Sequence, residues 1–340
     1  MIEIDGSHGE GGGQVVRTAV ALSVLTQKPI HITNIRKGRT EGGLKHQHVE
    51  AVHALASLCN ATVEGASVGS SELFFDPKPI RTRHVMITIP TAGSIALVLQ
   101  GIMIAAAHAP HPITIDITGG SISSKWAAPV HYIKYVLFKH LAAMNYACTL
   151  DIKQYGYYPK GCAHVQATLH PATLKPLVRM HQGTARFIEG ISHASETLKK
   201  AQVAERQQQS AQKLLEKICT SHIAVEYHET TSPGSAIDLW CTTTETVIGA
   251  DALGEREKKA EDVGKEAAEQ LLKELKSGAG IDHHAADQLL PYLALATNIG
   301  ESKITTSEIT EHARTNAWVI EQFLPVTFVF KEKTISCKAV

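Results

Sequence analysis

Apolar residues recur along the first half of the chain at two spacings, which divide it into short strands and amphipathic helices. Ile2-Glu3-Ile4 alternates as a half-buried strand does, and Val15, Val16, Ala19 and Leu22 follow at helical spacing. The same patterns predict strands at 30–34, 61–64, 73–75, 84–89, 113–117, 148–152 and 163–169, and helices near 47–59, after Ser94 and at 129–141. The order strand, helix, strand, strand recurs, which favours an α/β or α+β domain with helices on a sheet.

The pattern changes near Gly183, where a charge-rich segment begins that extends to Gly278-Ala279-Gly280. Strands are predicted in it at 187–191, 223–227, 235–241 and 246–249, and long polar helices at 196–217 and 257–276. The chain then turns apolar again at 288–297, before a helix at 316–323 and a final strand at 327–330. We therefore expect a small α/β domain at 183–278, inserted into a large domain formed by 1–182 and 279–340.

Composition narrows the class of protein. Lys plus Arg and Asp plus Glu each number 33 in 340 residues, so no overall field attracts nucleic acid or membrane, and a nucleic acid would be bound locally. The six cysteines show no C-x-x-C spacing, which favours buried thiols in a reducing compartment. We expect no signal peptide and no membrane partner, because the most apolar run, Ile95–Ala107, is interrupted by Gln100 and is short for a bilayer. A cytoplasmic location is expected.

The glycine-rich loop Gly6–Gln14 is the first candidate for chemistry. Its five glycines between residues 6 and 13 let successive N–H groups point into one hollow, at the start of a helix that favours anions. Glu10 would repel a phosphate unless a divalent cation lay between them, and Arg17 is placed one turn further on. The alternative is a tight turn with a solvated Glu and Arg. The loop lacks the Gly-Lys-Ser/Thr ending of a P-loop.

Other candidate residues have equally ordinary alternatives. The basic turn with Arg36 and Arg39, followed by Gln47 and His48, suits phosphate but is also typical of an exposed turn. Asp287, in the stretch His283–Gln288, could orient a metal or a ribose, although acidic residues are common in a first helical turn. His312, one of 19 histidines, precedes a predicted helix, where most histidines are structural. Gln100 alone in an apolar helix is typical of a hydrogen-bonded core residue.

Taken together, these residues resemble the RNA 3′-terminal phosphate cyclase family over nearly the whole chain. No single glycine motif is as specific as this many matches in one order. They are Gly9–Gln14 with Arg17, Arg36 and Arg39, Gly43-Leu44 with Gln47-His48, Ala92-Gly93-Ser94 with Gln100, Gly156–Pro159, Ala286-Asp287-Gln288, His312 with Thr315-Asn316, and Phe323-Leu324-Pro325. The resemblance implies a large domain of repeated βαβαββ units with a small α/β domain inserted.

The same resemblance implies ATP-dependent conversion of an RNA 3′-phosphate end into a 2′,3′-cyclic phosphate. His312 matches the nucleophile that attacks the α-phosphate of ATP and forms histidyl–AMP. AMP then passes to the RNA phosphate, and the neighbouring 2′-OH displaces it. Neutral imidazole suits this role, because it is nucleophilic near pH 7 and leaves readily once phosphorylated.

The family's binding residues carry over by the same resemblance. Glu10 matches the ligand of a divalent metal, Mg²⁺ or Mn²⁺. The RNA end or phosphate would be seated by Arg36, Arg39, Gln47 and His48, and ATP by Arg17, Gln100, Pro129, His284, Ala285, Ala286, Asp287 and Gln288. Relatives often have tyrosine where this chain has His284, so we expect its affinity for the base to differ. The resemblance implies no oligomeric state.

Two other classes compete with this interpretation. A non-catalytic cyclase-like protein that supports ribosome assembly would keep the fold and lose the nucleophilic histidine, whereas this chain has His312 with Glu10 and Arg17. An enolpyruvyl transferase also consists of repeated α/β units. It would need neither His312 in this context nor this form of the glycine-rich loop.

Overall fold

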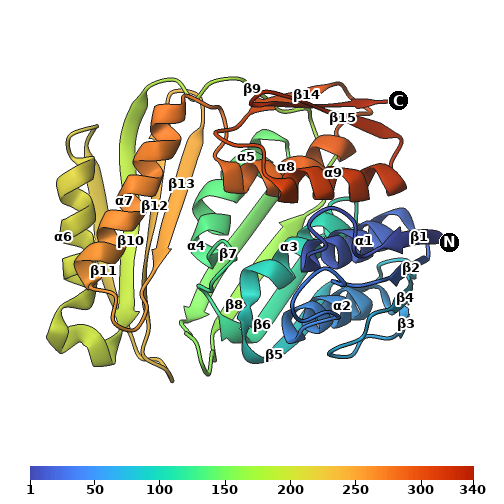
Figure 1. Ribbon diagram of the computed structural model, residues 1–340, viewed down its shortest axis with the longest axis horizontal. Helices are drawn as coiled ribbons and strands as arrows, with labels where there is room; N and C mark the ends of the chain where they lie inside the picture. Colours follow the sequence, from blue (N-terminus) through green and yellow to red (C-terminus); the bar gives the residue numbers. More distant parts are fainter.

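The computed structural model describes all 340 residues, which form four mixed sheets of four strands each, with helices packed against them (Figure 1). The first sheet contains β1 (Ile2–Asp5), β2 (Ile30–Thr33), β4 (Leu73–Asp76) and β3 (Thr62–Glu64), in that spatial order. The second contains β5 (His84–Ser94), β6 (Ile113–Ser121), β8 (His164–His170) and β7 (Ala147–Gln154). The third contains β9 (Val178–Arg179), β14 (Ser302–Thr305), β16 (Thr334–Ala339) and β15 (Val326–Lys331).

These three sheets share one pairing pattern. In each, the first two strands in space are parallel and the remaining pairs are antiparallel. Parallel neighbours need a crossover connection, and α1 (Gly13–Thr26) and α3 (Ile95–Ala106) provide it in the first two sheets. In the third sheet, the connection from β9 to β14 contains residues 183–278 and α8 (His283–Leu295).

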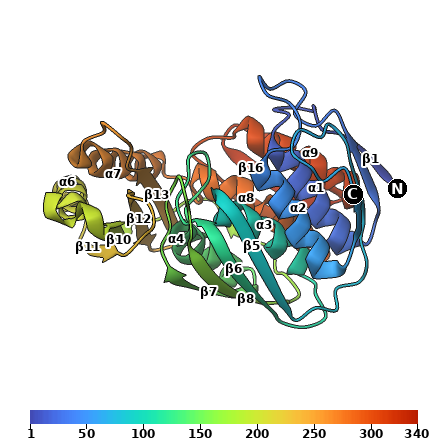
Figure 2. The same cartoon turned by 90° about the horizontal axis from the view of Figure 1, so that it is seen from below.

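The fourth sheet lies within residues 183–278. It consists of β11 (Ser221–His228), β10 (Ala185–Ser195), β12 (Ser235–Thr243) and β13 (Val247–Leu253), with α6 (Val203–Leu215) and α7 (Ala260–Ser277) packed on it. Figures 1 and 2 show this segment to one side of the remaining chain. Gly249 of β13 approaches α4 (Val130–Tyr132) so closely that a Cβ there would lie 2.6 Å from a ring carbon of Tyr132, so a side chain at this position would force the two parts apart.

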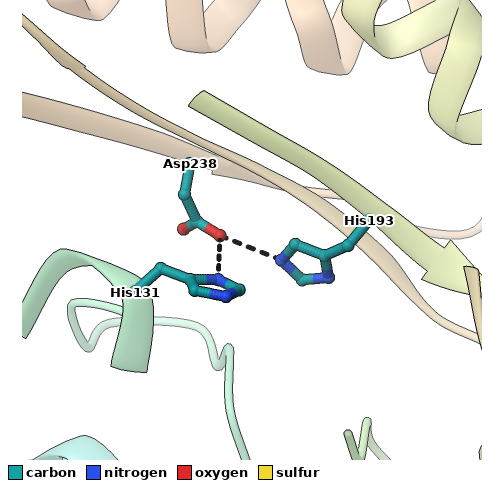
Figure 3. A group of neighbouring side chains, drawn as sticks. All are labelled: His131, His193 and Asp238. Atoms are coloured by element: carbon teal, nitrogen blue, oxygen red, sulfur yellow. Dashed lines mark hydrogen bonds and ion pairs between the residues drawn. The ribbon is translucent and has the colours of Figure 1, made fainter. Parts of the chain in front are cut away.

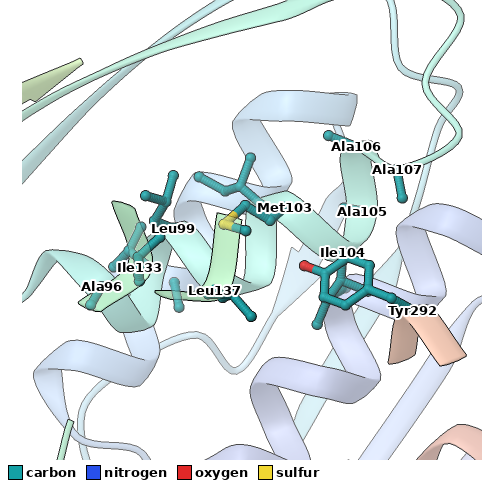
Figure 4. Packing of buried hydrophobic residues seen from close by; sticks show 14 of the residues in the cluster. Ala96, Leu99, Met103, Ile104, Ala105, Ala106, Ala107, Ile133, Leu137 and Tyr292 are labelled. Carbon is teal, nitrogen blue, oxygen red and sulfur yellow. The ribbon is translucent and has the colours of Figure 1, made fainter. Parts of the chain in front are cut away.

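Helices of the larger part pack on one another. α1 contacts α2 (His46–Cys59), α3 and α9 (Glu311–Phe323), and α8 contacts α9. Their apolar faces join a core of 80 buried residues, part of which is shown in Figure 4, where Leu99 and Met103 of α3 lie near Ile133 and Leu137. A separate core of 14 buried residues is formed within the range 188–271 of the chain. None of the helices combines the length and apolar composition needed to cross a bilayer.

The mixed α/β class is confirmed, and several element boundaries differ from the predictions. The helix predicted at 316–323 begins at Glu311, because the Thr310 hydroxyl accepts a hydrogen bond from the Ala313 N–H and caps it five residues earlier. The helix predicted at 196–217 is a 3₁₀ segment (Glu196–Ala201) and then α6, separated by Gln202 in the left-handed region at φ 48°. The helix predicted at 129–141 contains a π-helical turn (Ile133–Leu137) between α4 and α5 (Phe138–Ala143).

Three strands were not predicted. β9 has two residues, too few to show a period, and β14 has four, of which only Ile304 is apolar; both are held by pairing within the third sheet. β16 does alternate, with Ile335 and Cys337 buried, so the signal for it was present in the sequence.

Candidate active site

The glycine-rich loop leads from β1 into α1 and is held against two other helices. Gly9 and Gly11 are left-handed, with φ of 59° and 56°, which other residues adopt only with strain. A Cβ at Gly9 would lie 2.4 Å from Thr315 Oγ1 of α9, and a Cβ at Gly13 would lie 1.8 Å from His48 Nε2 of α2. Glycine is therefore needed for both helices to approach the loop. The first N–H groups of any helix have no intrahelical acceptor, and in α1 no capping side chain accepts from them either.

His312, in the first turn of α9, meets this loop. Its Nδ1 lies 2.6 Å from Gln14 Oε1, and its Nε2 lies 3.0 Å from Glu10 Oε2. The other oxygen of Glu10 accepts a hydrogen bond from Arg39 Nη2 at 2.7 Å. Nearly half of the His312 side chain is exposed. The imidazole is thus accessible while both of its nitrogens have defined partners.

A chain of hydrogen bonds fixes Gln14 in turn. Its Nε2 donates to Asp287 Oδ1 at 2.7 Å, and Asn316 Nδ2 donates to the same carboxylate at 3.2 Å and to the Asp287 carbonyl at 3.0 Å. That carbonyl needs a donor from outside α8, because Pro291, four residues later, has no N–H. Thr18 Oγ1 donates to Asn316 Oδ1 at 2.8 Å. Since the Gln14 amide nitrogen faces Asp287, its oxygen accepts a hydrogen bond from His312 Nδ1, which therefore carries a proton. The contact of Nε2 with the Glu10 carboxylate also needs a proton on the imidazole side.

Burial shifts the ionisation of two charged groups here. It raises the pKa of Asp287, against the opposing hydrogen bonds from Gln14 and Asn316. It also lowers the pKa of Arg17 to about 10, while Asp287 acts in the opposite direction. Arg17 still carries its charge at neutral pH. A partly desolvated guanidinium of this kind attracts anions more strongly than a solvated one.

A cavity of about 480 Å³ opens beside His312, between residues 183–278 and the rest of the chain. One wall comes from α1, α3, α8 and α9, and the opposite wall from β13 and α7. Lys125 and Trp126 lie in the loop before α4, and Lys125 pairs with Glu255 across the junction at 2.6 Å. Burial, with repulsion from Asp238 and Asp282, raises the pKa of Asp251 to about 8. Polar and charged lining residues include Gln14, Arg17, Gln100, Asp251, Glu266, Gln270, His284, Asp287, Gln288 and His312.

The structure brings most of the residues singled out from the sequence to this place. The residues that line the cavity are Arg17, Gln100, His284, Asp287, Gln288 and His312. Glu10 contacts His312 from the loop, and Arg39 of the basic turn contacts Glu10. Ala285 and Ala286 are buried in α8 and do not line it. Pro129 is also buried, and its neighbours Ala127 and Ala128 line the cavity in its place. Gln288 Oε1 is buried and has no hydrogen-bond partner.

Arg36, Gln47 and His48 do not line the cavity. His48 is 1% exposed, and its Nδ1 accepts a hydrogen bond from the Lys45 N–H at 3.0 Å, at the start of α2. Burial, with repulsion from Arg17 and Arg36, lowers its pKa to about 3, so the imidazole is neutral. Arg36 donates to the carbonyl of Glu41, and its backbone φ is 57°. In this structure Arg36 braces the basic turn, and His48 holds the start of α2.

The sequence reading gave no role to Gln14, Thr18 or Asn316, although all three belong to the hydrogen-bonded chain. A signal for them existed. Gln14 and Thr18 are four residues apart on α1, and His312 and Asn316 are four apart on α9, so each pair shares one helix face. By contrast, no local sequence pattern indicates that Asp251, Glu266 and Gln270 line the cavity, because this depends on how residues 183–278 pack against the rest of the chain.

Side chains with the chemistry of metal ligands occur at two places, a single carboxylate and a cluster. Glu10 is a single half-buried carboxylate at the loop. His131, His193 and Asp238 form a separate buried cluster at the junction and do not line the cavity.

Comparisons with known proteins show one consistent similarity. A model of the RNA 3′-terminal phosphate cyclase family matches residues 8–330. The RNA 3′-terminal phosphate cyclase of Methanosarcina mazei is 44% identical over 353 residues, covering 98% of this chain and 97% of that protein. Those of Methanopyrus kandleri and Thermococcus kodakarensis are 41% and 43% identical, covering 98% and 96% of this chain and 96% and 94% of the relative. The similarity runs through residues 183–278 and through the cavity.

Proposed function

Because this chain belongs to the RNA 3′-terminal phosphate cyclase family, we propose that it is an enzyme that converts RNA 3′-phosphate ends into 2′,3′-cyclic phosphates, using ATP as a second substrate. One observation carries the proposal: an accessible histidine with an oriented imidazole stands between an uncapped helix N-terminus and a polar cavity. The histidine provides a nucleophile, the helix N-terminus can bind phosphates, and the cavity can hold a nucleoside.

His312 is the proposed nucleophile. Nδ1 keeps its proton in the hydrogen bond to Gln14, and the attacking lone pair is that of Nε2, which becomes free once Glu10 turns from it toward a cation. Nε2 bonds to the α-phosphorus of ATP, and the bond from that phosphorus to the bridging oxygen breaks to release pyrophosphate. Gln14 acts as a positioning residue here, because it keeps the ring orientation and tautomer required for the attack.

The phosphates are placed by charge. Arg17, on the cavity side, and Arg39, on the loop side, flank His312, and the free N–H groups of α1 face the same region. A guanidinium on each side would stabilise the charge that develops on the transferred phosphoryl group.

Glu10 fits the role of metal ligand. Mg²⁺ and Mn²⁺ are commonly held by one or two carboxylates plus phosphate oxygens, and one carboxylate beside a phosphate-seeking helix end matches this donor set. Such a cation neutralises charge on the phosphate oxygens. With Glu10 turned to a cation, the Nε2 atom of His312 would no longer be engaged by that carboxylate.

The nucleoside is proposed to occupy the cavity. Gln100, His284, Asp287 and Gln288 line it, and the unpartnered Gln288 Oε1 could accept from an exocyclic amine or a ribose hydroxyl. Ala285 and Ala286 would shape the pocket through the backbone of α8, whose N-terminus is capped by Asp282. A contact of Pro129 with the base stays a prediction.

The RNA end is proposed to enter from the loop side, next to Arg39, with Arg36, Gln47 and His48 supporting the turn that carries it. After adenylylation of His312, an oxygen of the RNA 3′-phosphate bonds to the α-phosphorus and the P–N bond breaks, which returns the lone pair to His312. The 2′-hydroxyl oxygen then bonds to the 3′-phosphorus, loses its proton and expels AMP. The adjacent hydroxyl is already held near the activated phosphate, so proximity favours ring closure.

We further propose that the first three sheets belong to three copies of a βαβαββ unit, and that residues 183–278 are an inserted α/β domain within 1–182 and 279–340. The shared strand order of the three sheets supports the repeat. The separate core between Ile188 and Leu271 and the left-handed Gly183 and Gly278 at its ends support the inserted domain. A cytoplasmic location stays a prediction.

Incubation with ATP labelled at the α-phosphate tests the proposal. The wild-type protein should acquire acid-labile label, and His312→Ala should acquire none and form no cyclic ends, with an unchanged circular dichroism spectrum. His283→Ala is the matched control, because this histidine also lines the cavity but pairs with Glu274 at 2.7 Å. Undiminished labelling of His312→Ala would overturn the assignment.

A further inference from the structure

Outside the candidate active site, two imidazoles from different parts of the chain face one buried carboxylate. The carboxylate is that of Asp238, in β12. Its Oδ2 lies 2.8 Å from His131 Nδ1, in α4, and 2.9 Å from His193 Nε2, in β10 (Figure 3). The three residues are at most 2% exposed, and one ligand atom from each lies within 4.8 Å of the others. Two nitrogen donors and a carboxylate thus converge on one point in the interior.

The second oxygen of the carboxylate has no partner. Asp238 Oδ1 is buried and accepts no hydrogen bond from any protein group. A buried carboxylate oxygen without a donor is costly, because it has lost its hydration and gained nothing in exchange. A cation at the point of convergence would supply the missing interaction.

The outer nitrogens of both histidines already have hydrogen-bond partners. His193 Nδ1 lies 2.7 Å from the Tyr157 hydroxyl, and His131 Nε2 lies 3.0 Å from the Tyr155 hydroxyl. Tyr155 in turn donates to Glu226 Oε2 at 3.0 Å. Histidines that bind a metal through one nitrogen usually donate the other N–H to an oxygen acceptor, which fixes the tautomer and the ring. Both rings show this outer arrangement.

We propose that His131, His193 and Asp238 form a binding site for a divalent transition metal, with Zn²⁺ as the best match. Two imidazole nitrogens and a carboxylate oxygen are preferred zinc ligands, and either oxygen of Asp238 can be the third of them, with a water as the fourth. Bonds of about 2.0–2.1 Å require ligand atoms about 3.3 Å apart. The present contacts of 2.8 and 2.9 Å must therefore open by about half an ångström, a side-chain adjustment.

The charges at this place also suit a dication. Asp238 would balance one of the two charges of Zn²⁺, and the half-buried Glu226, which accepts a hydrogen bond from Tyr155, places a further negative charge nearby. The metal would join α4 to β10 and β12, and therefore residues 183–278 to the larger part that shares the cavity. Its role is structural, and it does not depend on the proposed reaction.

Zinc binding to chelator-treated protein tests this site. The parent protein for the test is Glu10→Gln, which removes the carboxylate proposed for the active-site metal. Competition with a chromophoric chelator should show about one Zn²⁺ per chain with submicromolar affinity, and Zn²⁺ should raise its melting temperature. Asp238→Asn should weaken binding at least about a hundredfold, and Tyr157→Phe, which removes only the outer hydrogen bond, about tenfold.

His164→Gln is the matched control, because it breaks a different His–Asp pair, the 2.6 Å contact with Asp116 in the second sheet, and should leave the affinity unchanged. Substitution of Co²⁺ should give the intense visible absorption of a four-coordinate site in the parent and lose it in Asp238→Asn. If Asp238→Asn does not fold, Tyr157→Phe decides. Millimolar or weaker binding by the parent, or equal affinity in the parent and Tyr157→Phe, would overturn the site.

Discussion

His312 and Gln14 lie 298 positions apart in the chain, and their side chains meet at 2.6 Å. The contact gives the two ring nitrogens different surroundings. Nδ1 faces a neutral amide oxygen, whereas Nε2 faces the Glu10 carboxylate and is accessible. Chemistry at this residue therefore depends on two neighbours that can be changed separately.

Replacing Gln14 by glutamate tests the first neighbour. A carboxylate at this position favours the protonated imidazole, which cannot attack, so the acid limb of the pH–labelling profile should move upward by about one pH unit. Gln14→Leu, which neither accepts nor donates, should lower labelling about tenfold without moving that limb. A Gln14→Glu profile that coincides with the wild type would show that the amide does not position the nucleophile.

Replacing Glu10 by glutamine tests the second neighbour. The amide keeps the shape of the side chain but loses the charge that would hold a cation, so adenylylation should fall on the order of a hundredfold. Excess Mg²⁺ or Mn²⁺ should restore it only in part. Glu41→Gln, at an exposed residue of the basic turn that pairs with Lys45, is the control and should react as the wild type does. A Glu10→Gln rate equal to wild type across a metal titration would mean that Glu10 is only a turn residue.

At the level of elements, the helices around the site begin in different ways, and each beginning has a consequence. In α8 and α9, an N–H group of the first turn donates to a capping side chain, Asp282 and Thr310 respectively. α1 has no side-chain cap and leaves its N–H groups to a ligand. α2 depends on His48, which accepts from the Lys45 N–H while buried.

His48 predicts a pH dependence of stability. Its pKa is about 3 in the folded protein and about 6.5 when unfolded, so below pH 6.5 the unfolded chain binds a proton that the folded protein does not. The free energy of unfolding should fall by up to about 1.4 kcal/mol per pH unit from pH 6.5 toward 3 on account of this group. His48→Gln keeps an acceptor suited to this capping position and removes the titration. Urea unfolding between pH 7 and 4.5 should give a shallower slope for the variant, and parallel slopes would contradict this.

For the molecule as a whole, charge and shape indicate how RNA is bound. The chain has no net charge, and its phosphate-seeking groups are confined to the loop, the basic turn and Arg17. The cavity lies between residues 183–278 and the larger part, so the relative position of the two parts determines its size. This arrangement suits the recognition of an RNA end. It does not provide a long basic track.

An RNA whose terminal sugar lacks the 2′-hydroxyl separates activation from ring closure. Activation needs only the terminal phosphate, whereas closure needs the hydroxyl, so a 2′-deoxy, 3′-phosphate end should accumulate as an RNA–AMP diester detectable by mass or gel mobility. Log affinity should fall only modestly with log salt, because few phosphates are neutralised. A 3′-OH end is the control and should give no cyclic product. Absence of the diester, under conditions where the ribose substrate cyclises, would overturn the order of steps.

The sequence alone determined the features that depend on local periodicity and on motifs. The presence of α1, the bounds of α2 to within one residue, the order of strands and helices up to β8, and the mixed α/β class follow from hydrophobic spacing and turn residues. The family was recognisable from polar residues in a fixed order, and the comparisons confirm it. Such features could be predicted because each is encoded within a few neighbouring residues.

Tertiary structure decided everything that depends on contacts between distant segments. Only the packed structure shows that Gln14 contacts His312 and that His48 is buried and neutral. It also shows that Asn316 donates to the Asp287 carbonyl, which has no donor within α8 because Pro291 lacks an N–H. The cavity places the wall around Asp251 opposite residues of α1 and α3, more than 100 positions earlier in the chain. The His131–Asp238–His193 cluster likewise joins Asp238 to histidines 107 and 45 positions away. Burial and long-range contact change the ionisation and partners of these side chains, and a local pattern contains no information about either.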